Sequence, residues 1–321
     1  MRRPLPILAC ALGLGLALAG CTPAANLTAK RAEAAVVPPM LAPADLPSFF
    51  DCLRESGATI ISAHRGGPQD GFPENALETL QHTLAAAPVA LEIDISRTRD
   101  GVLVLMHDDS LDRTSTGNGL ISETTYAELE GLRLQDRQGQ ITAFSIPRLD
   151  AVLAWAKGRT ILQLDVKRGV PFAEVVEAVQ RAGGQENALI ITYNDRDAAR
   201  VSALDPSLYV SAQARTNRDV AGLRRAKAGL ATIGAWTGIK DPDPAGFSAL
   251  AAEGIEVFFG TLGRPGERLD DQYAAEGGAG WVRLREAGVN LIASDRPLEA
   301  FAALDHADGP GVQWAECLVA K

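Results

Sequence analysis

Three acidic side chains at the ends of predicted strands could hold a divalent cation. Glu92 and Asp94 stand two residues apart in an apolar run, so on an extended strand their side chains share one face. Two carboxylates on one buried face repel each other unless a cation lies between them. Asp165, at the end of the next long strand, can supply a third carboxylate, and all-oxygen ligands favour Ca²⁺ or Mg²⁺. The alternative for Glu92 is a salt bridge with Arg65.

Two histidines follow apolar, strand-like runs, at the places where strands end. These are His64 and His107, and a side chain that titrates near neutral pH can serve as a general acid or base. A single histidine would more often be structural, but two of them beside a carboxylate site favour acid–base roles. Arg65 offers a planar fork that matches phosphate, and Lys167 shares a strand face with Asp165. For Lys167 we expect contact with phosphate or with the carboxylates.

Glu74 and Asn75 stand just before a predicted helix. Asn75, with Glu78 three residues later, fits a helix N-cap of the capping-box type. Glu74 could contact and orient the metal ligands or His64 without touching the metal itself, or it could interact with the helix dipole.

Several short motifs share an order and spacing with one enzyme family. They are His64-Arg65-Gly66, Pro73-Glu74-Asn75, Glu92-x-Asp94, Asp100-Gly101, His107-Asp108, Arg113-Thr114, Leu164-Asp165-Val166-Lys167 and Ala293-Ser294-Asp295-Arg296-Pro297. Together they resemble the signature of the glycerophosphodiester phosphodiesterase family, over roughly residues 58 to 304. The resemblance is weakest between residues 195 and 290.

The resemblance implies metal-dependent hydrolysis of glycerophosphodiesters to glycerol 3-phosphate and an alcohol. It implies His64 and His107 as acid and base, Arg65 and Lys167 as phosphate contacts, and Ca²⁺ or Mg²⁺ on Glu92, Asp94 and Asp165. One residue departs from the family, which usually has glutamate where this chain has Asp165. A carboxylate that is one methylene shorter must approach the ion more closely or bind it through water.

Two other functions remain open at this point. A phospholipase D-like enzyme of the same fold could act on phospholipids or lysophospholipids, which would require an apolar mouth around Trp236 and Phe258. A non-catalytic lipoprotein could bind phosphodiesters without turnover, but binding alone needs no pair of histidines.

Eight strand-like runs alternate with helix-like runs and predict a (β/α)8 TIM barrel. The strand-like runs are Thr59–Ala63, Val89–Ile95, Thr160–Val166, Ala188–Thr192, Leu208–Ser211, Ala231–Gly234, Glu256–Gly260 and Asn290–Ser294. The alternative is a doubly wound open sheet, but the sequence contains nothing that resembles the glycine-rich fingerprint of that fold. The segment from His107 to Pro147 is too long for an ordinary loop, which predicts a small insertion after the second strand with a helix over Thr125–Leu132.

The N-terminal part predicts export and a lipid anchor. Residues 1–20 contain two arginines followed by a short apolar run, as in a lipoprotein signal peptide. The predicted cleavage precedes Cys21, the lipidation site. Residues 21–47 are rich in Ala and Pro and are predicted to form a tether. Residues 48–321 are predicted to form the phosphodiesterase domain. We expect a bacterial cell-envelope protein that faces the periplasm and meets the membrane through its anchor only. The net charge of −9 argues against nucleic acid as a partner.

Two cysteines are left once Cys10 in the signal and Cys21 at the lipid site are set aside. They are Cys52, shortly before the first strand, and Cys317, after the last helical run. Export into an oxidising compartment favours a disulfide between them, and a closed barrel brings its last unit beside its first strand. The alternative is a pair of buried free thiols.

Overall fold

The described part of the chain, residues 40–308 and 313–319 of a computed structural model, forms a closed barrel. Its strands are β1 (Ile60–Ala63), β2 (Ala90–Arg97), β3 (Leu103–Leu105), β4 (Leu162–Val166), β5 (Ala188–Thr192), β6 (Tyr209–Gln213), β7 (Ile233–Trp236), β8 (Glu256–Gly260) and β9 (Leu291–Ser294). All are parallel neighbours except β3, which pairs antiparallel with β2 outside the barrel. Pairing of β1 with both β2 and β9 closes the ring, which confirms the predicted (β/α)8 barrel.

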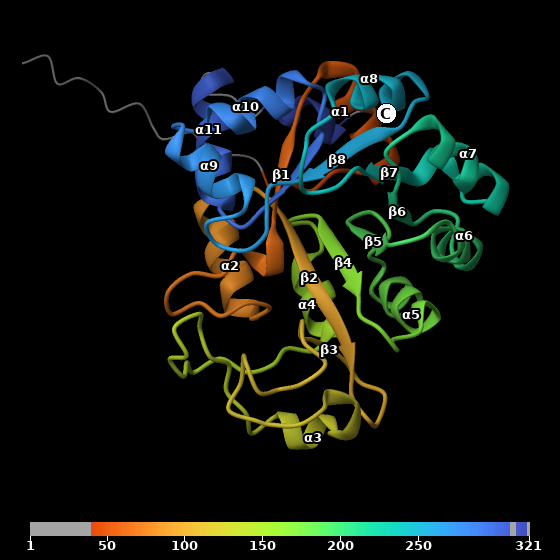
Figure 1. The fold of residues 1–321 in the computed structure, drawn as a ribbon. Coiled ribbons are helices and arrows are strands. Elements are labelled where there is room, and N and C mark those ends of the chain that lie inside the picture. The colour runs from red at the N-terminus through yellow and green to blue at the C-terminus, as the bar shows by residue number, and fades with distance from the viewer. Residues whose placement is uncertain (1–39, 309–312, 320–321) are drawn as a thin grey trace, which may run out of the picture. The chain divides into compact units, whose positions relative to one another are not determined.

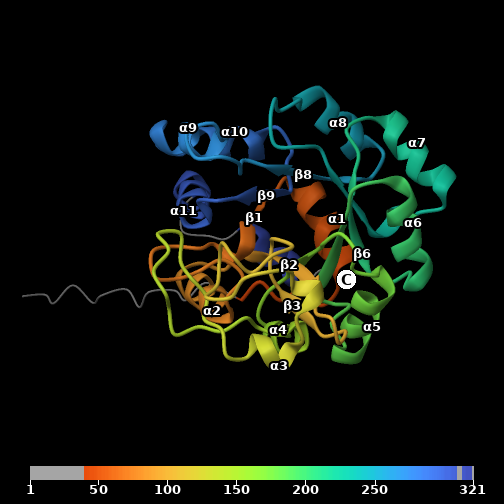
Figure 2. The same cartoon turned by 60° about the horizontal axis from the view of Figure 1, so that its bottom comes forward.

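Helices surround the strands, as Figure 2 shows in a view that brings the lower end of Figure 1 forward. They are α1 (Leu46–Ser56), α2 (Leu77–Ala86), α3 (Tyr126–Leu129), α4 (Leu149–Ala156), α5 (Phe172–Ala182), α6 (Asp195–Leu204), α7 (Asn217–Ala226), α8 (Pro244–Ala252), α9 (Leu269–Ala275), α10 (Ala279–Glu286) and α11 (Pro297–Asp308). Short 3₁₀ turns are η1 (His64–Gly66), η2 (Ile121–Glu123), η3 (Leu230–Thr232) and η4 (Gln313–Val319). Because η3 takes Leu230–Thr232, β7 begins two residues later than predicted.

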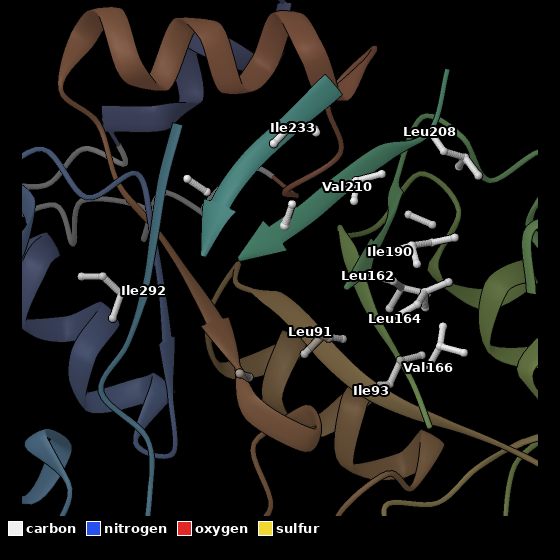
Figure 3. Packing of buried hydrophobic residues seen from close by; sticks show 14 of the residues in the cluster. Leu91, Ile93, Leu162, Leu164, Val166, Ile190, Leu208, Val210, Ile233 and Ile292 are labelled. Atoms are coloured by element: carbon white, nitrogen blue, oxygen red, sulfur yellow. The ribbon is translucent and has the colours of Figure 1, made fainter. Parts of the chain in front are cut away.

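The two faces of each barrel strand carry different side chains. On β2, Leu91 and Ile93 are fully buried and point out toward the helices, as Leu164 does on β4 (Figure 3). Successive side chains of a strand alternate between faces, so Glu92 and Asp94 point into the barrel. The same alternation that buries the apolar layer therefore places the two carboxylates together inside.

Helix α1 covers the end of the barrel where the strands begin (Figure 1). Its Phe50 stacks on Tyr209 with ring centroids 4.6 Å apart and contacts Phe258 at 5.1 Å. Phe258 is fully buried in this cluster, so it does not line the mouth that a phospholipase would require. Leu41 and Leu46 are also fully buried in the cluster. The packed chain thus begins before residue 48, because these side chains complete the core of this end.

A disulfide joins α1 to η4. Cys52 and Cys317, the predicted pair, are bonded, with Cα atoms 5.5 Å apart and a sequence separation of 265. Such a long closed loop restricts the unfolded chain and can stabilise the fold by about 5 kcal/mol at most.

The predicted insertion after the second strand lies at the opposite end, where the strands stop (Figure 1). It has its own apolar core, formed by Ala76, Val104, Met106, Leu111, Ile121, Leu129, Leu134 and Ile146. Its helix α3 is shorter than the predicted Thr125–Leu132, although Thr125 and Glu128 form the capping box that starts it. The insertion therefore packs as a small layer beside the ends of the strands.

The predicted signal peptide and the lipidation site Cys21 lie outside the described residues. Within the described part, no helix combines the length and the apolar character that crossing a bilayer requires.

Candidate active site

Three buried carboxylates meet where β2 and β4 end inside the barrel. Glu92, Asp94 and Asp165 each offer an oxygen, and these oxygens lie within 4.8 Å of one another. The residues are 6%, 1% and 6% exposed. Parallel pairing of β2 with β4 places Asp94 directly beside Asp165, which explains the third member of the cluster. The structure thus brings together all three predicted metal-ligand candidates.

Lys167 offsets only part of this negative charge. Its Nζ lies 2.6 Å from Asp94 Oδ1 and 2.6 Å from Asp165 Oδ2. Burial opposes the charge of Asp94, but Lys167, His107 and the amide of Asn75 together lower its pKa. Burial and the neighbouring charge of Asp94 raise the pKa of Glu92 to about 8. Glu92 is therefore the carboxylate of the cluster whose negative charge is least compensated.

Arg65 contacts the cluster mainly through its backbone. Its N–H donates to Glu92 Oε2 at 2.7 Å, and a φ of 52° aims it there. The guanidinium instead pairs with Glu74, at 3.0 Å between NH1 and Oε1. The alternative of a Glu92–Arg65 salt bridge is therefore wrong, because the side chain of Arg65 turns toward Glu74.

Asn75 orients Asp94 and does not cap a helix. Its Nδ2 donates to Asp94 Oδ2 at 2.7 Å, and its Oδ1 accepts from the Asp94 N–H at 3.0 Å. The N-cap of α2 is Ala76, which makes no side-chain cap bond, so the capping-box prediction is wrong. Asn75 has a φ of 61°, a left-handed conformation that asparagine tolerates better than most residues. This conformation turns the amide away from the helix start and toward β2.

Tyr193, which the sequence analysis did not single out, holds Asp165. Its hydroxyl donates to Asp165 Oδ1 at 2.9 Å, while Lys167 occupies the other oxygen. Tyr193 directly follows β5, and a polar aromatic residue at a strand end was the signal that could have identified it. These two donors fix the shorter carboxylate in the cluster.

Each predicted histidine forms a pair with an aspartate. His64 Nδ1 lies 2.7 Å from Asp295 Oδ1, and His107 Nδ1 lies 2.7 Å from Asp108 Oδ1. An ionised carboxylate only accepts hydrogen bonds, so Nδ1 carries the proton in each pair and Nε2 is left for a substrate. Burial opposes charge on His64, but the hydrogen bond to Asp295 and the negative charges of Glu92 and Asp295 together outweigh it and raise the pKa of His64.

Asp295 is itself held from three sides. Its Oδ2 accepts from the Gly263 N–H at 3.0 Å and pairs with Arg268 NH1 at 3.0 Å. Beneath it, the fully buried Asp270 accepts from the Asp295 N–H at 2.6 Å and from Ser294 Oγ at 2.7 Å. The position of Asp295 at the end of the last strand, in the last of the family-like motifs, was the signal for this role.

Glu74 belongs to a chain of ion pairs between the barrel and the insertion. Besides Arg65, it binds Arg113, with 2.7 Å between Arg113 NH2 and Glu74 Oε1. Arg113 in turn binds Asp108 at 2.6 Å, and Asp108 holds His107. Of the two roles considered for Glu74, the supporting one agrees with these contacts, although it is Arg65 and Arg113 that it orients. The chain of pairs connects both histidine-bearing regions.

The carboxylate cluster fits a divalent cation. The donors are all oxygens, which hard cations prefer, and they lie close enough to share one ion. The raised pKa of Glu92, beside Asp94 and Asp165, is what a site built for an added cation would show before the cation binds. Glu92, Asp94 and Asp165 would hold the ion.

Comparisons with known proteins point to one family. Residues 64–299 match the "Glycerophosphoryl diester phosphodiesterase family". Over 161 residues the chain is 33% identical to a glycerophosphodiester phosphodiesterase of Bacillus altitudinis, a region that covers 48% of this chain and 65% of that relative. The chain thus spans slightly less than two thirds of the length of this curated relative.

Solved structures match over more of the chain. A glycerophosphoryl diester phosphodiesterase from Parabacteroides distasonis is 29% identical, with a TM-score of 0.75, and the match covers 86% of this chain and 97% of that one. A phosphodiesterase from Oleispira antarctica, solved in complex with the product sn-glycerol-3-phosphate, has a TM-score of 0.61 at 24% identity and covers 78% and 99%. At this lower identity the likeness shows the fold. The chain belongs to the glycerophosphoryl diester phosphodiesterase family.

Proposed function

We propose that this protein hydrolyses glycerophosphodiesters to glycerol 3-phosphate and an alcohol, with a divalent cation and two histidines. The observation that carries the proposal is the cluster of Glu92, Asp94 and Asp165 in a site that also holds two His–Asp pairs. Membership of the family supports the substrate class. The glycerol 3-phosphate bound to the Oleispira antarctica enzyme is the product that this reaction would release.

The three carboxylates would hold Ca²⁺ or Mg²⁺. Such an ion, when bound, neutralises phosphate charge and lowers the pKa of a hydroxyl that it touches. Asp165 has its oxygens fixed by Tyr193 and Lys167, so its shorter side chain is already directed at the cluster. Asn75 does the same for Asp94.

The two histidines would move the protons. In the reaction that the family resemblance implies, the neighbouring glycerol hydroxyl attacks phosphorus, and the oxygen of the leaving alcohol departs. Nε2 of one histidine accepts the proton of the attacking hydroxyl, and Nε2 of the other donates a proton to the leaving oxygen. Water then opens the cyclic phosphate with the two roles exchanged. Asp295 and Asp108 keep the rings of His64 and His107 in the required orientation.

Arg65 and Lys167 would stabilise the charge on the phosphoryl oxygens. The Nε of Arg65 is buried and lies 3.9 Å from Asp94 Oδ2, but it makes no hydrogen bond, so it retains a donor for a ligand. Lys167 is buried between two carboxylates that raise its pKa against the effect of desolvation, and it therefore stays charged near neutral pH. Both cations would act where negative charge increases in the transition state.

The test is a turnover assay with the purified domain. Glycerophosphocholine, glycerophosphoethanolamine and glycerophosphoglycerol are each incubated with enzyme treated with EDTA and with Ca²⁺ or Mg²⁺ added back. We expect no release of glycerol 3-phosphate in EDTA and release with added metal. Full activity in metal-stripped enzyme would contradict the metal site, and binding of the diesters with no turnover under any condition would contradict the proposed reaction.

We further propose that Cys21 carries a lipid that anchors the mature protein in the bacterial envelope, facing the periplasm. The support is the sequence Leu18-Ala19-Gly20-Cys21 after a short apolar run. Cys21→Ser should move the protein from the membrane fraction to the soluble fraction of the periplasm. An unchanged distribution would contradict the anchor.

A further inference from the structure

The insertion presents an arginine, Arg137, from a firmly held turn. Asp136 Oδ1 accepts from the Gln138 N–H at 3.0 Å, which closes the turn around Arg137. Asp136 Oδ2 accepts from the Gly71 N–H at 3.0 Å, and the side chain of Gln138 bonds to Asp70. The tip of the insertion is thereby docked onto the loop between β1 and α2. The position of Arg137 is fixed relative to the barrel.

Arg137 lines a cavity of about 630 Å³ next to the candidate active site. Gly67, Arg268 and Asp295 line the same cavity. Asp295 is the residue that holds His64, so the cavity adjoins the histidine at the end of β1. The cavity lies on the Asp295 side of His64, so a substrate group that extends to that side would meet Arg137.

The acids of this cavity already have partners. Asp295 binds His64 and Arg268, Glu299 binds Arg296, and Asp70 accepts from Gln138. Within residues 40–308 and 313–319, no carboxylate forms an ion pair with the guanidinium of Arg137. Arg137 is thus a cation without a matching anion in a cavity whose other charges are paired.

The surroundings of Arg137 oppose its positive charge. Partial desolvation lowers the pKa of Arg137, and the nearby charges of Arg268 and Arg65 lower it further, while Asp295 and Glu74 act in the opposite direction. The side chain is exposed to solvent, so a bound anion would gain mainly from the combined positive charge of Arg137 and its arginine neighbours. The planar fork of N–H donors of Arg137 matches two oxygens of a phosphate or a carboxylate.

We propose that Arg137 binds an anionic group of the substrate in this cavity. This inference rests on the proposed phosphodiesterase function and extends it to a residue of the insertion. The anion is either a phosphoryl oxygen of the scissile diester or an acidic group on the leaving alcohol, and both have the chemistry that the guanidinium would bind. The two sources differ in what they predict for substrates.

Two substrates that differ by one carboxylate distinguish the two candidate anions. Glycerophosphoserine carries an acidic group that glycerophosphoethanolamine lacks. Loss of a hydrogen-bonded charge pair should lower kcat/KM of Arg137→Gln by about 10- to 100-fold. An equal loss on both substrates assigns Arg137 to the phosphoryl oxygens, and a loss confined to glycerophosphoserine assigns it to the alcohol.

Three controls distinguish this role from a structural one. Arg137→Lys keeps the charge and should recover part of the loss, mainly in KM. Arg181→Gln removes an exposed charge on α5 and should leave kcat/KM unchanged. The melting temperature of Arg137→Gln should match that of the unaltered protein, because Asp136 and Gln138 hold the turn.

Kinetic constants of Arg137→Gln within twofold of the unaltered protein on both substrates would overturn the inference. A second measurement separates this result from failure of the proposed function. Calorimetric binding of glycerophosphoserine, which carries both candidate anions, to the metal-supplemented protein should weaken about tenfold or more in Arg137→Gln. If the unaltered protein has no turnover, weaker binding in the variant supports the anion site, and equal binding rejects it.

Discussion

His64 and Asp295 stand 231 residues apart in the chain, yet His64 Nδ1 lies 2.7 Å from Asp295 Oδ1. They meet because β1 and β9 pair in parallel, with Ala63 opposite Ser294, so the residues that follow the two strands emerge side by side. Closure of the barrel is therefore a condition for assembling this pair. Asp270 holds the backbone of Asp295 from below, which gives the carboxylate a fixed position.

Asp295→Asn tests what the charge of this carboxylate does for His64. Asparagine can still accept a hydrogen bond from Nδ1, but it cannot stabilise the imidazolium by charge. Since Asp295 raises the pKa of His64, its removal should lower that pKa and move the histidine limb of the pH–rate profile to lower pH. We expect kcat to fall about 10- to 100-fold. Asp150→Asn, an exposed change on α4, is the control, and an unshifted profile in Asp295→Asn would show that the pair is only structural.

The two histidines should act as a unit. Alanine in place of either His64 or His107 should lower kcat by about 10²- to 10⁴-fold, the usual contribution of a general acid or base. The double variant should lose less than the product of the two single losses, because groups that serve one transition state are not additive. Near-normal turnover in either single variant, measured under saturating substrate, would reassign that histidine to a structural role.

Asn75 allows the backbone and the side chain to be tested separately. Asn75→Gly and Asn75→Ala both lose the two bonds to Asp94, so both should bind the activating metal more weakly. Only alanine also places a β-carbon at a φ of 61°, which costs about 1 kcal/mol or more of strain. We expect Asn75→Ala to melt at a lower temperature than Asn75→Gly, with similar metal affinities. Metal affinities equal to that of the unaltered protein would show that Asp94 needs no orientation by Asn75.

The barrel and most of the candidate site could be predicted from local patterns in the sequence. Ala188–Thr192 and Glu256–Gly260 were predicted with their observed bounds, because a buried apolar run between polar loops is a strong signal for a parallel strand. Glu92 and Asp94 were predicted to share a face because the strand period fixes it.

The residues that support the site were harder to predict. Tyr193 and Asp295 act through partners 28 and 231 residues away, and no local pattern carries such contacts. Asn75 was misread because Asn followed by Glu at the third position fits a capping box, and the sequence does not show the left-handed backbone that turns the amide to Asp94. Local signals thus predict elements and their faces, whereas the orientation of side chains depends on closure of the barrel.

The disulfide should stabilise the fold without affecting the chemistry. Cys52 and Cys317 lie at the α1 end of the barrel, opposite the carboxylate cluster. Replacing both by serine should lower the free energy of unfolding by up to about 5 kcal/mol, while kcat at 25 °C stays unchanged. Denaturant unfolding of the exported domain, with and without a reducing agent, measures the effect. Two free thiols in the denatured, unreduced protein would show that the bond does not form during export.

Glu92 makes the metal-free protein sensitive to pH. Its pKa is about 8 in the folded state, against an ordinary value of 4.5, because burial and the charge of Asp94 oppose its ionisation. Between these two values the folded state keeps a proton that the unfolded state has released. The free energy of unfolding must therefore fall as pH rises through this window and become flat, for this group, above pH 8. The full effect is on the order of a few kcal/mol.

Urea unfolding in EDTA from pH 5 to 9 measures this contribution. Glu92→Gln cannot ionise and should show a smaller decrease in stability than the unaltered protein, while Glu177→Gln, an exposed change on α5, should behave like the unaltered protein. Saturating Ca²⁺ or Mg²⁺ should also remove most of the slope, because a bound cation keeps Glu92 ionised in the folded state. If Glu92→Gln and the unaltered protein lose stability in parallel across the window, Glu92 does not hold the proton. The carboxylate cluster would then owe its charge balance to Lys167 and Arg65.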